Sequence, residues 1–146
     1  MRNKFLLLHI IFPILIGAVF YYLLSPDVIF VKQIDELLGC GFHLELAIRG
    51  HWIFQFMRIY MVDMLWGYAL VFALFFIVDS NAAGRKEILF IAMALSAIME
   101  ILQLTPLVQG TFDLWDILVE FLAEMVAVFI INKYTAEEVT TNEKKE

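Results

Sequence analysis

The sequence has few of the residues that build disulfides, nucleic-acid interfaces and soluble surfaces. Cys40 is the only cysteine among 146 residues, which excludes an intrachain disulfide and a thiolate metal cluster. Charged residues make up 18% of the chain and hydrophobic residues 62%, a balance that excludes an ordinary soluble domain of this size. Lysine and arginine form no basic cluster, so nucleic acid is not a predicted partner. No P-loop, zinc or nucleophile motif indicates a specific reaction.

Long apolar runs dominate what the sequence does contain. A bilayer-spanning helix needs roughly 20 predominantly apolar residues, and four stretches are that long: 5–24, 59–78, 87–104 and 114–131. We therefore predict an all-α, polytopic membrane protein in which residues 1–134 form a domain of four transmembrane helices in contact with membrane lipids. Residues 135–146 are charged and poor in apolar side chains, so we predict a disordered cytoplasmic tail.

The distribution of basic residues predicts the orientation of these helices. Arg2 and Lys4 precede the first stretch as in a signal peptide, but the apolar run is too long and no cleavage pattern follows, so we expect an uncleaved helix. Arg85 and Lys86 lie in the second connection, and further lysines lie in the tail. The positive-inside rule therefore places both termini and the second connection on the cytoplasmic side of the membrane.

The long first loop, which would face outward, contains a predicted amphipathic helix. Ser25-Pro26-Asp27 is a helix-start pattern, apolar residues recur at helical spacing to Leu38, and Gly39 and Gly41 are stop signals. The sequence leaves open whether this helix lies flat in the membrane interface or covers the bundle as a lid. His43 and His51, further along the loop, are predicted to make interfacial polar contacts.

A row of acids inside the last apolar stretch is the most informative feature of the chain. Asp113, Asp116, Glu120 and Glu124 are spaced so that, at about 100° per residue, they lie within an arc of about 80° on one helix face. Ionisable residues in a membrane helix are costly, and they usually face a bundle interior or a wet cavity where they mark a site.

Two other predicted helices bring polar residues to the same outer level. Glu100 and Gln103 lie at the end of the third stretch, and Arg58 and Asp63 lie at the start of the second. We therefore predict one polar site near the outer face of the membrane. The residue types alone do not assign a role to this site. Its candidate residues are Arg58, Asp63, Glu100, Gln103, Asp113 and Asp116.

The charge balance of this site limits its chemistry. Six acids lie near a single base, Arg58, and so many carboxylates cannot all stay ionised without compensation. A divalent cation such as Mg²⁺ or Ca²⁺ is one solution, protons for acid–base chemistry are another, and a purely structural hydrogen-bond network is a third. Glu124, the deepest acid, is expected to be protonated and to donate a hydrogen bond to Ser96 or to a backbone carbonyl. The candidate metal ligands are Glu100, Asp113, Asp116 and Glu120.

These residues resemble the VanZ-like family of small multi-pass bacterial membrane proteins. The similar motifs are Glu100-Ile101-Leu102-Gln103, Thr111-Phe112-Asp113-Leu114-Trp115-Asp116 and the helix start from Arg58 to Leu70, and the resemblance covers about 58–128. Thr111, Glu120 and Ala123 depart from it, since the family usually has Arg, Asn and Gly there. The missing Arg weakens an anion-binding role, and Glu120 favours a cation or a proton. The resemblance implies a role in the cell envelope, because the family is named for a member linked to teicoplanin resistance.

Three functions are compatible with this sequence. The leading hypothesis is a membrane protein whose acidic site binds or acts on a cell-envelope component, such as a lipid-linked or phosphorylated envelope lipid or glycan precursor. The acids would then hold a divalent cation or serve as acid and base if the protein is an enzyme. The second hypothesis is a small proton- or cation-coupled transporter, and the third is a non-catalytic accessory subunit of a membrane complex.

Overall fold

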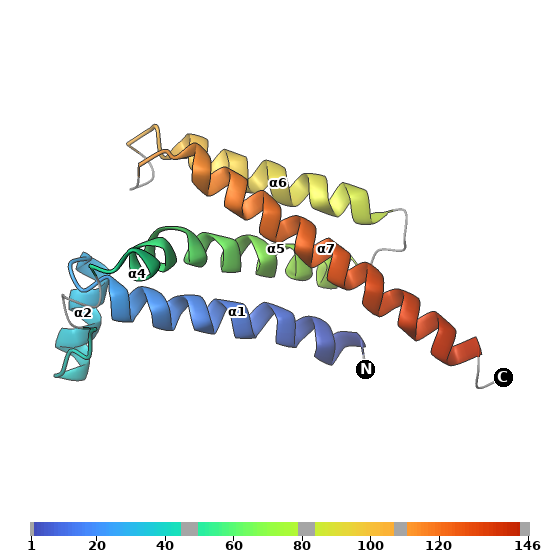
Figure 1. The fold of residues 1–146 in the computed structure, drawn as a ribbon, viewed down its shortest axis with the longest axis horizontal. Helices are drawn as coiled ribbons and strands as arrows, with labels where there is room; N and C mark the ends of the chain where they lie inside the picture. Colours follow the sequence, from blue (N-terminus) through green and yellow to red (C-terminus); the bar gives the residue numbers. More distant parts are fainter. Residues whose placement is uncertain (1, 45–49, 79–83, 107–110, 144–146) are drawn as a thin grey trace.

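The protein is a bundle of long helices. The computed structural model describes residues 2–44, 50–78, 84–106 and 111–143, and its secondary structure within these ranges is entirely helical, as predicted. A short helix, α2 (Ile29–Leu38), lies across the end of the first long helix (Figure 1). The long helices run along the length of the molecule and are α1 (Arg2–Leu24), α5 (Val62–Val78), α6 (Gly84–Leu102) and α7 (Leu114–Glu143).

Two helical segments of the described chain, not the four predicted, are long and apolar enough by composition to cross a membrane. They are Asn3–Leu24 and Trp52–Val78. Helices α6 and α7 are also long, but both carry several charged residues along their length. The outward side of α1 is strongly apolar, and large side chains there are more than half exposed. These side chains are Leu8, Ile11, Phe12, Leu15 and Val19.

The second long helical segment starts earlier than residue 59, the predicted start. Helix α4 (Trp52–Phe56) and a π-helical segment, η1 (Met57–Met61), lead directly into α5. The His51 side chain accepts a hydrogen bond from the Ile53 backbone N–H and caps the start of α4. This cap, rather than the irregular loop we expected before residue 59, sets where the helix begins.

The third and fourth long helices also differ from their predicted ends. Helix α6 covers Gly84–Leu102 rather than 87–104, because the chain tightens into short-range turns after Glu100. Helix α7 continues to Glu143, through most of the tail that we expected to be disordered. No Gly or Pro interrupts this stretch, and Tyr134, the residue directly before the tail, stacks on Phe5 of α1 with ring centroids 3.9 Å apart.

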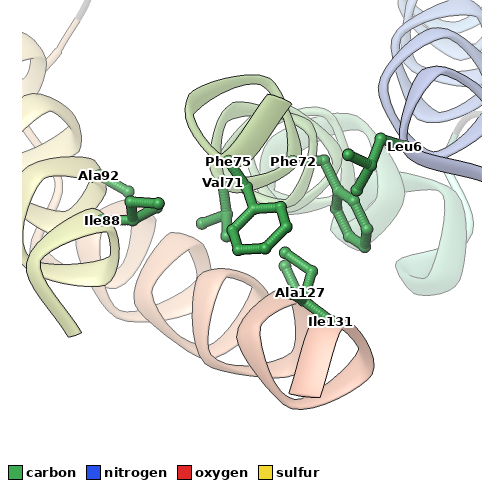
Figure 2. Close-up of a cluster of buried hydrophobic side chains, with 8 residues drawn as sticks. All are labelled: Leu6, Val71, Phe72, Phe75, Ile88, Ala92, Ala127 and Ile131. Atoms are coloured by element: carbon green, nitrogen blue, oxygen red, sulfur yellow. The ribbon is translucent and has the colours of Figure 1, made fainter. Parts of the chain in front are cut away.

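Helix α5 packs against both α1 and α7, and α6 packs against α7 and α5. Phe72, fully buried, lies beside Leu6 of α1, whereas Ala92 lies with Ile88 of α6 on the opposite side of the cluster (Figure 2). This region of the bundle is a dry apolar core. Its buried residues are Leu6, Val71, Phe72, Phe75, Ile88, Ala92, Ala127 and Ile131.

The predicted amphipathic helix is present, but its start differs from the prediction. Ser25 to Asp27 form a turn closed by the Val28 N–H on the Ser25 carbonyl (3.2 Å), and the N-cap residue of α2, Val28, makes no side-chain capping bond. The stop signal is confirmed, since Gly39 has a left-handed backbone with φ of 69°. Among the apolar residues of α2 only Val31 is buried, and Figure 1 places α2 away from α6 and α7. In this structure α2 is not a lid over the acids.

A polar clasp holds α2 to α1. The Asp35 carboxyl accepts a hydrogen bond from the Tyr22 hydroxyl (2.7 Å) and pairs with His43 Nε2 (2.7 Å). His43 Nδ1 lies 3.0 Å from the Tyr22 carbonyl oxygen, so both nitrogens of the ring face oxygen atoms. The polar contacts expected for His43 are therefore intramolecular, and they join the two helices through Asp35.

The clasp makes the docking of α2 sensitive to acid. The Tyr22 hydroxyl and the His43 ring hold the pKa of Asp35 below its ordinary value of about 3.9. A lowered folded-state pKa contributes stability above the ordinary value and loses it as the pH falls through the folded value. We expect a spin label on Cys40, the exposed single cysteine, to stay immobile at neutral pH and to gain mobility only below about pH 4.

Two variants control this electron paramagnetic resonance experiment. Asp35→Asn removes the charged acceptor and should give a mobile label already at pH 7. Glu36→Gln changes an exposed neighbour and should behave like the unmodified protein. An immobile label in Asp35→Asn at pH 7 would show that the clasp does not hold α2.

Candidate functional site

Glu100 joins the end of α6 to the start of α7. Its Oε1 accepts a hydrogen bond from the Gln103 side-chain amide (2.7 Å), and its Oε2 accepts one from the Asp113 backbone N–H (3.3 Å). The carboxyl is buried, with 7% of Glu100 exposed. The structure therefore brings together Glu100, Gln103 and Asp113, three of the predicted site residues.

Asp113 serves as the N-cap of α7. Its Oδ1 accepts a hydrogen bond from the Trp115 backbone N–H (2.9 Å), which satisfies a donor that the first helical turn would leave open. Asp116 follows in the first turn of the helix, where an acid interacts favourably with the helix dipole. Its Oδ1 is buried and has no hydrogen-bond partner among the described residues.

Three helices bring their carboxyls together at this end of the bundle. Asp63 of α5 lies close enough to Glu100 of α6 and Asp116 of α7 for their charges to interact. Glu120, one helical turn after Asp116, is buried and interacts with Asp63 and Glu100 in the same way. We call Asp63, Glu100, Asp116 and Glu120 the carboxyl cluster. Its members repel one another when they are all ionised.

A glycine allows α5 and α7 to approach at the carboxyl cluster. A Cβ atom added at Gly67 would lie 3.3 Å from the Glu120 backbone oxygen and 3.4 Å from its Cβ. The missing side chain lets the two backbones pack closely, as small residues do between membrane helices. Gly67 thereby sets the position of Glu120 next to Asp63.

Polar groups continue inward from the carboxyl cluster as far as Glu124. Glu124 is fully buried, and its Oε1 accepts a hydrogen bond from the Ser96 hydroxyl of α6 (2.8 Å). Ser96 was one of the two partners that we expected for Glu124, but with Glu124 as the donor, whereas here the Ser96 hydroxyl donates. Val71, Ala92 and Ala127 of the apolar core lie beyond it, which closes the polar region on the inner side.

Arg58 is the predicted site residue that the structure does not bring into the cluster. It lies in η1 with its side chain exposed. Within the described part of the chain, no ion pair joins a lysine or arginine to the carboxyl cluster. Arg85, at the opposite end of the bundle, donates a hydrogen bond to the Asn132 side chain (2.5 Å). The charge of the cluster is thus not balanced by a described base.

The predicted metal ligands do not form a coordination sphere. Among the described residues, no group of three His, Cys, Asp or Glu side chains is placed to hold a metal ion. Glu100 and Asp113 are already engaged by backbone and amide donors, which leaves Asp116 and Glu120 as the freer pair. The geometry fits protons, or a positively charged ligand group, better than a metal held by the protein alone.

Two apolar pockets lie along α5. The first, about 330 Å³, lies between α1 and α5 and includes Gly17, Val62 and Trp66. The second, about 250 Å³, lies between α5 and α7 and includes Met64 and Ala123. Their walls are almost entirely apolar, so each fits a hydrocarbon chain rather than a polar molecule.

Sequence reasoning missed a polar pair in the inner half of the bundle. His9 Nδ1 lies 2.6 Å from the Tyr68 hydroxyl, and the His9 ring stacks on Phe72 with centroids 4.6 Å apart. An ionisable residue within the first apolar stretch was the signal that would have identified it. The pair links α1 to α5 and lies outside the carboxyl cluster.

Comparisons of the whole sequence found no matching protein family, no similar curated protein and no similar solved structure.

Gly67 provides a test of how closely the helices must pack at the carboxyl cluster. Gly67→Val should destabilise the protein by about 1–3 kcal/mol, since the added atoms overlap the α7 backbone. Gly67→Ala should be nearly neutral, because a helix-propensity gain of about 1 kcal/mol offsets the tight Cβ contact. Gly17→Ala is the matched control: its Cβ would meet Leu65 at an ordinary 3.7 Å, so no loss is expected in thermal unfolding. A harmless Gly67→Val would contradict this packing.

Two variants of Glu100 distinguish the effect of its hydrogen bonds on stability from the effect of its charge. Glu100→Ala removes the acceptors of two donors and should destabilise the protein by about 1–3 kcal/mol. Glu100→Gln keeps one acceptor and removes the repulsion from Asp63, Asp116 and Glu120, so it should be neutral or stabilising. Thermal unfolding in detergent measures both. Equal losses from the two variants would show that the charge on Glu100 is balanced by a favourable partner.

Proposed function

We propose that this chain is a multi-pass protein of the bacterial cytoplasmic membrane, with four transmembrane helices and both termini in the cytoplasm. Two segments are apolar enough to span a bilayer, and α6 and α7 run beside α5 in the same bundle. The acids that lower the mean hydropathy of α6 and α7 are buried: Glu100, Glu120 and Glu124 are 7%, 6% and 0% exposed. Inward-facing acids are the arrangement that membrane helices tolerate.

The apolar exterior also supports a lipid environment. Beyond the face of α1, large apolar side chains are exposed on the sides of α6 and α7 that point away from the bundle, among them Phe90, Ile98, Leu122 and Phe129. Such extensive exposure is not found on soluble monomers, whose largest apolar patches are a few hundred Å². Helix α2, with Phe30, Leu37 and Leu38 exposed, would lie in the outer interface.

The function we propose is the binding of a cell-envelope component at the outer end of the bundle, in a protein of VanZ-like type. The observation that carries this proposal is the convergence of Asp63, Glu100 and Asp116 from three helices without a described base. A structural network alone would pair its acids, whereas Asp116 Oδ1 is buried without a partner among the described residues. Such a site takes a ligand that supplies positive charge or hydrogen-bond donors.

The two apolar pockets along α5 favour a lipid-linked ligand. They are lined in part by Val62 and Met64, the chain neighbours of Asp63, while Asp63 itself lines neither pocket. A hydrocarbon chain in one of them would lie beside the first turn of α5, which carries Asp63. The head group would carry an amine, or it would be a phosphate that arrives with a bound cation, because a bare phosphate is repelled by the acids. If the bound component reacts, Asp116 and Glu120 are the groups free to exchange protons with it.

A small proton- or cation-coupled transporter is the second candidate. The extension of polar groups from the carboxyl cluster through Ser96 to Glu124 favours it. The apolar core beyond Glu124 opposes a polar route through the described part of the bundle, since Phe75, Ala127 and Ile131 are buried there and the His9–Tyr68 pair is engaged in its own hydrogen bond. Binding at the outer end needs no such route and is therefore preferred.

The proposed topology predicts where reporters are active. A fluorescent protein fused after Glu146 should fluoresce, since the carboxyl terminus is cytoplasmic, while alkaline phosphatase inserted after Gly39 should be active, since α2 is outside. The reverse pattern would place the carboxyl cluster on the cytoplasmic side. It would overturn the envelope function while leaving the bundle intact.

Ligand binding is tested by native mass spectrometry of protein purified with bacterial polar lipids. We expect the protein to retain a lipid, and Asp116→Asn to weaken its retention at least about tenfold, which corresponds to 1.4 kcal/mol. Glu87→Gln is the control, since Glu87 is an exposed acid at the opposite end of α6. Equal retention by Asp116→Asn and the unmodified protein would rule out the carboxyl cluster as the head-group site.

A further inference from the structure

The side of α1 that points away from the bundle carries a groove with one charged end. The groove has a volume of about 420 Å³ and is lined by Lys4, Leu7, Leu8, Ile11, Phe12 and Leu15, all residues of α1. Helix α1 packs against α5 and η1 through its opposite side, where Leu6, Pro13 and Gly17 are buried. Because α1 lies at the edge of the bundle (Figure 1), the groove is open to whatever surrounds the protein.

The charged end of the groove has no described acid to balance it. Lys4 is exposed, Arg2 begins the helix, and the first turn of α1 contains no acidic residue. Among the described residues, no ion pair joins Lys4 to a carboxylate. The open N–H groups of the first turn add partial positive charge at the same end. An anion from outside the chain is therefore favoured beside Lys4.

The length of the groove matches one leaflet of a bilayer. Positions 4 and 15 are 11 residues apart, which is about 16 Å along a helix, and half of a hydrocarbon core is about 15 Å. A second groove, of about 220 Å³, shares Phe12 and Leu15 with the first and continues to Phe20. Phe12 and Leu15 would thus lie near the middle of the bilayer, with Lys4 at the level of the head groups of one leaflet.

We propose that the groove on α1 binds one anionic phospholipid of the cytoplasmic leaflet. Its phosphate pairs with Lys4, and one acyl chain lies along Leu8, Ile11 and Leu15. The anionic lipids of a membrane favour basic residues at the cytoplasmic surface, and a lipid without net charge would leave the charge of Lys4 unbalanced. This inference rests on the proposed membrane location and orientation of the chain, but not on ligand binding at the carboxyl cluster.

A second copy of the chain fits this face less well than a lipid does. In a two-fold dimer formed through the face, the two Lys4 side chains would lie on the same side of the membrane and repel each other. Membrane helices also associate through small residues. The small residues Gly17 and Ala18 line the pocket toward α5, whereas the outward face presents large side chains such as Phe12 and Leu15. Flexible acyl chains can fill the spaces between such side chains.

Native mass spectrometry of the purified full-length protein tests the proposal. The protein is released from nanodiscs that contain equal parts of phosphatidylglycerol and phosphatidylcholine. We expect it to retain phosphatidylglycerol in preference, and Lys4→Gln to lower this preference about fivefold, which corresponds to ~1 kcal/mol. Equal retention of the two lipids by the unmodified protein, or an unchanged preference in Lys4→Gln, would overturn the proposal.

Lys32→Gln is the matched control for charge. It removes an exposed lysine of α2, which lies at the other end of α1 (Figure 1), and should leave the preference for phosphatidylglycerol unchanged. A loss as large as that in Lys4→Gln would show that any surface lysine selects the lipid, and would refute the groove as its site.

Ile11→Trp tests the apolar part of the groove. Ile11 is 51% exposed, so the larger side chain would fill the groove without entering the bundle, and we expect a loss of retained phosphatidylglycerol. Ile98→Trp makes the same change at a 50% exposed position of α6 and should cause no loss. Unchanged retention in Ile11→Trp would contradict the groove, and release of a dimer without lipid would assign this face to a second copy. Because Lys4 and the carboxyl cluster lie at opposite ends of the bundle, failure of ligand binding at the cluster would leave these outcomes unaffected.

Discussion

Each carboxyl buried in this bundle requires a hydrogen-bond donor, a bound proton or a nearby positive charge. The cost of leaving an ionised carboxylate unpaired in apolar surroundings is several kcal/mol, comparable with the whole stability of a small protein. Glu100 meets the requirement with the Gln103 amide and the Asp113 N–H, and Asp113 meets it with the Trp115 N–H. The connection between α6 and α7 is therefore organised by the acids themselves.

The two halves of the bundle differ in the kind of side chain that they bury. In the half that holds the apolar core, Phe72 and its neighbours exclude polar groups other than the His9–Tyr68 pair. In the other half, Gly67 lets α7 approach α5, and the carboxyls of three helices become neighbours. Close packing thus creates the charge repulsion that a ligand or a proton would relieve. A site of this kind costs stability and is retained where it serves a function.

Helical spacing was enough to predict that the acids of α7 share one face and meet polar residues of α6. The spacing does not show which oxygen accepts which N–H, because that depends on the turns at the ends of both helices. Asp113 was weighed as a metal ligand, although an Asp directly before an apolar run is also a capping signal. The clasp at Asp35 joins residues of three chain segments, and its partners cannot be read from periodicity.

The helix ends were predicted least well, because they too depend on contacts that the sequence pattern does not show. The start of α4 depends on a cap by the His51 side chain, and histidine is not among the preferred capping residues. Helix α7 continues past Tyr134, which stacks on Phe5 from near the other end of the chain, as far as Glu143. Composition alone therefore predicted disorder where the structure has a helix. The resemblance to the VanZ-like family stays a prediction.

The central claim is that carboxyls of α5 and α7 face each other inside the bundle. Cross-linking of paired cysteines in a Cys40→Ser background tests it most directly. Asp63→Cys combined with Asp116→Cys should be joined by a short bifunctional thiol reagent in membranes. Asp63→Cys combined with Leu118→Cys should not be joined, since Leu118 is 50% exposed on a different side of α7. Cross-linking of the second pair but not the first would contradict the arrangement of the site.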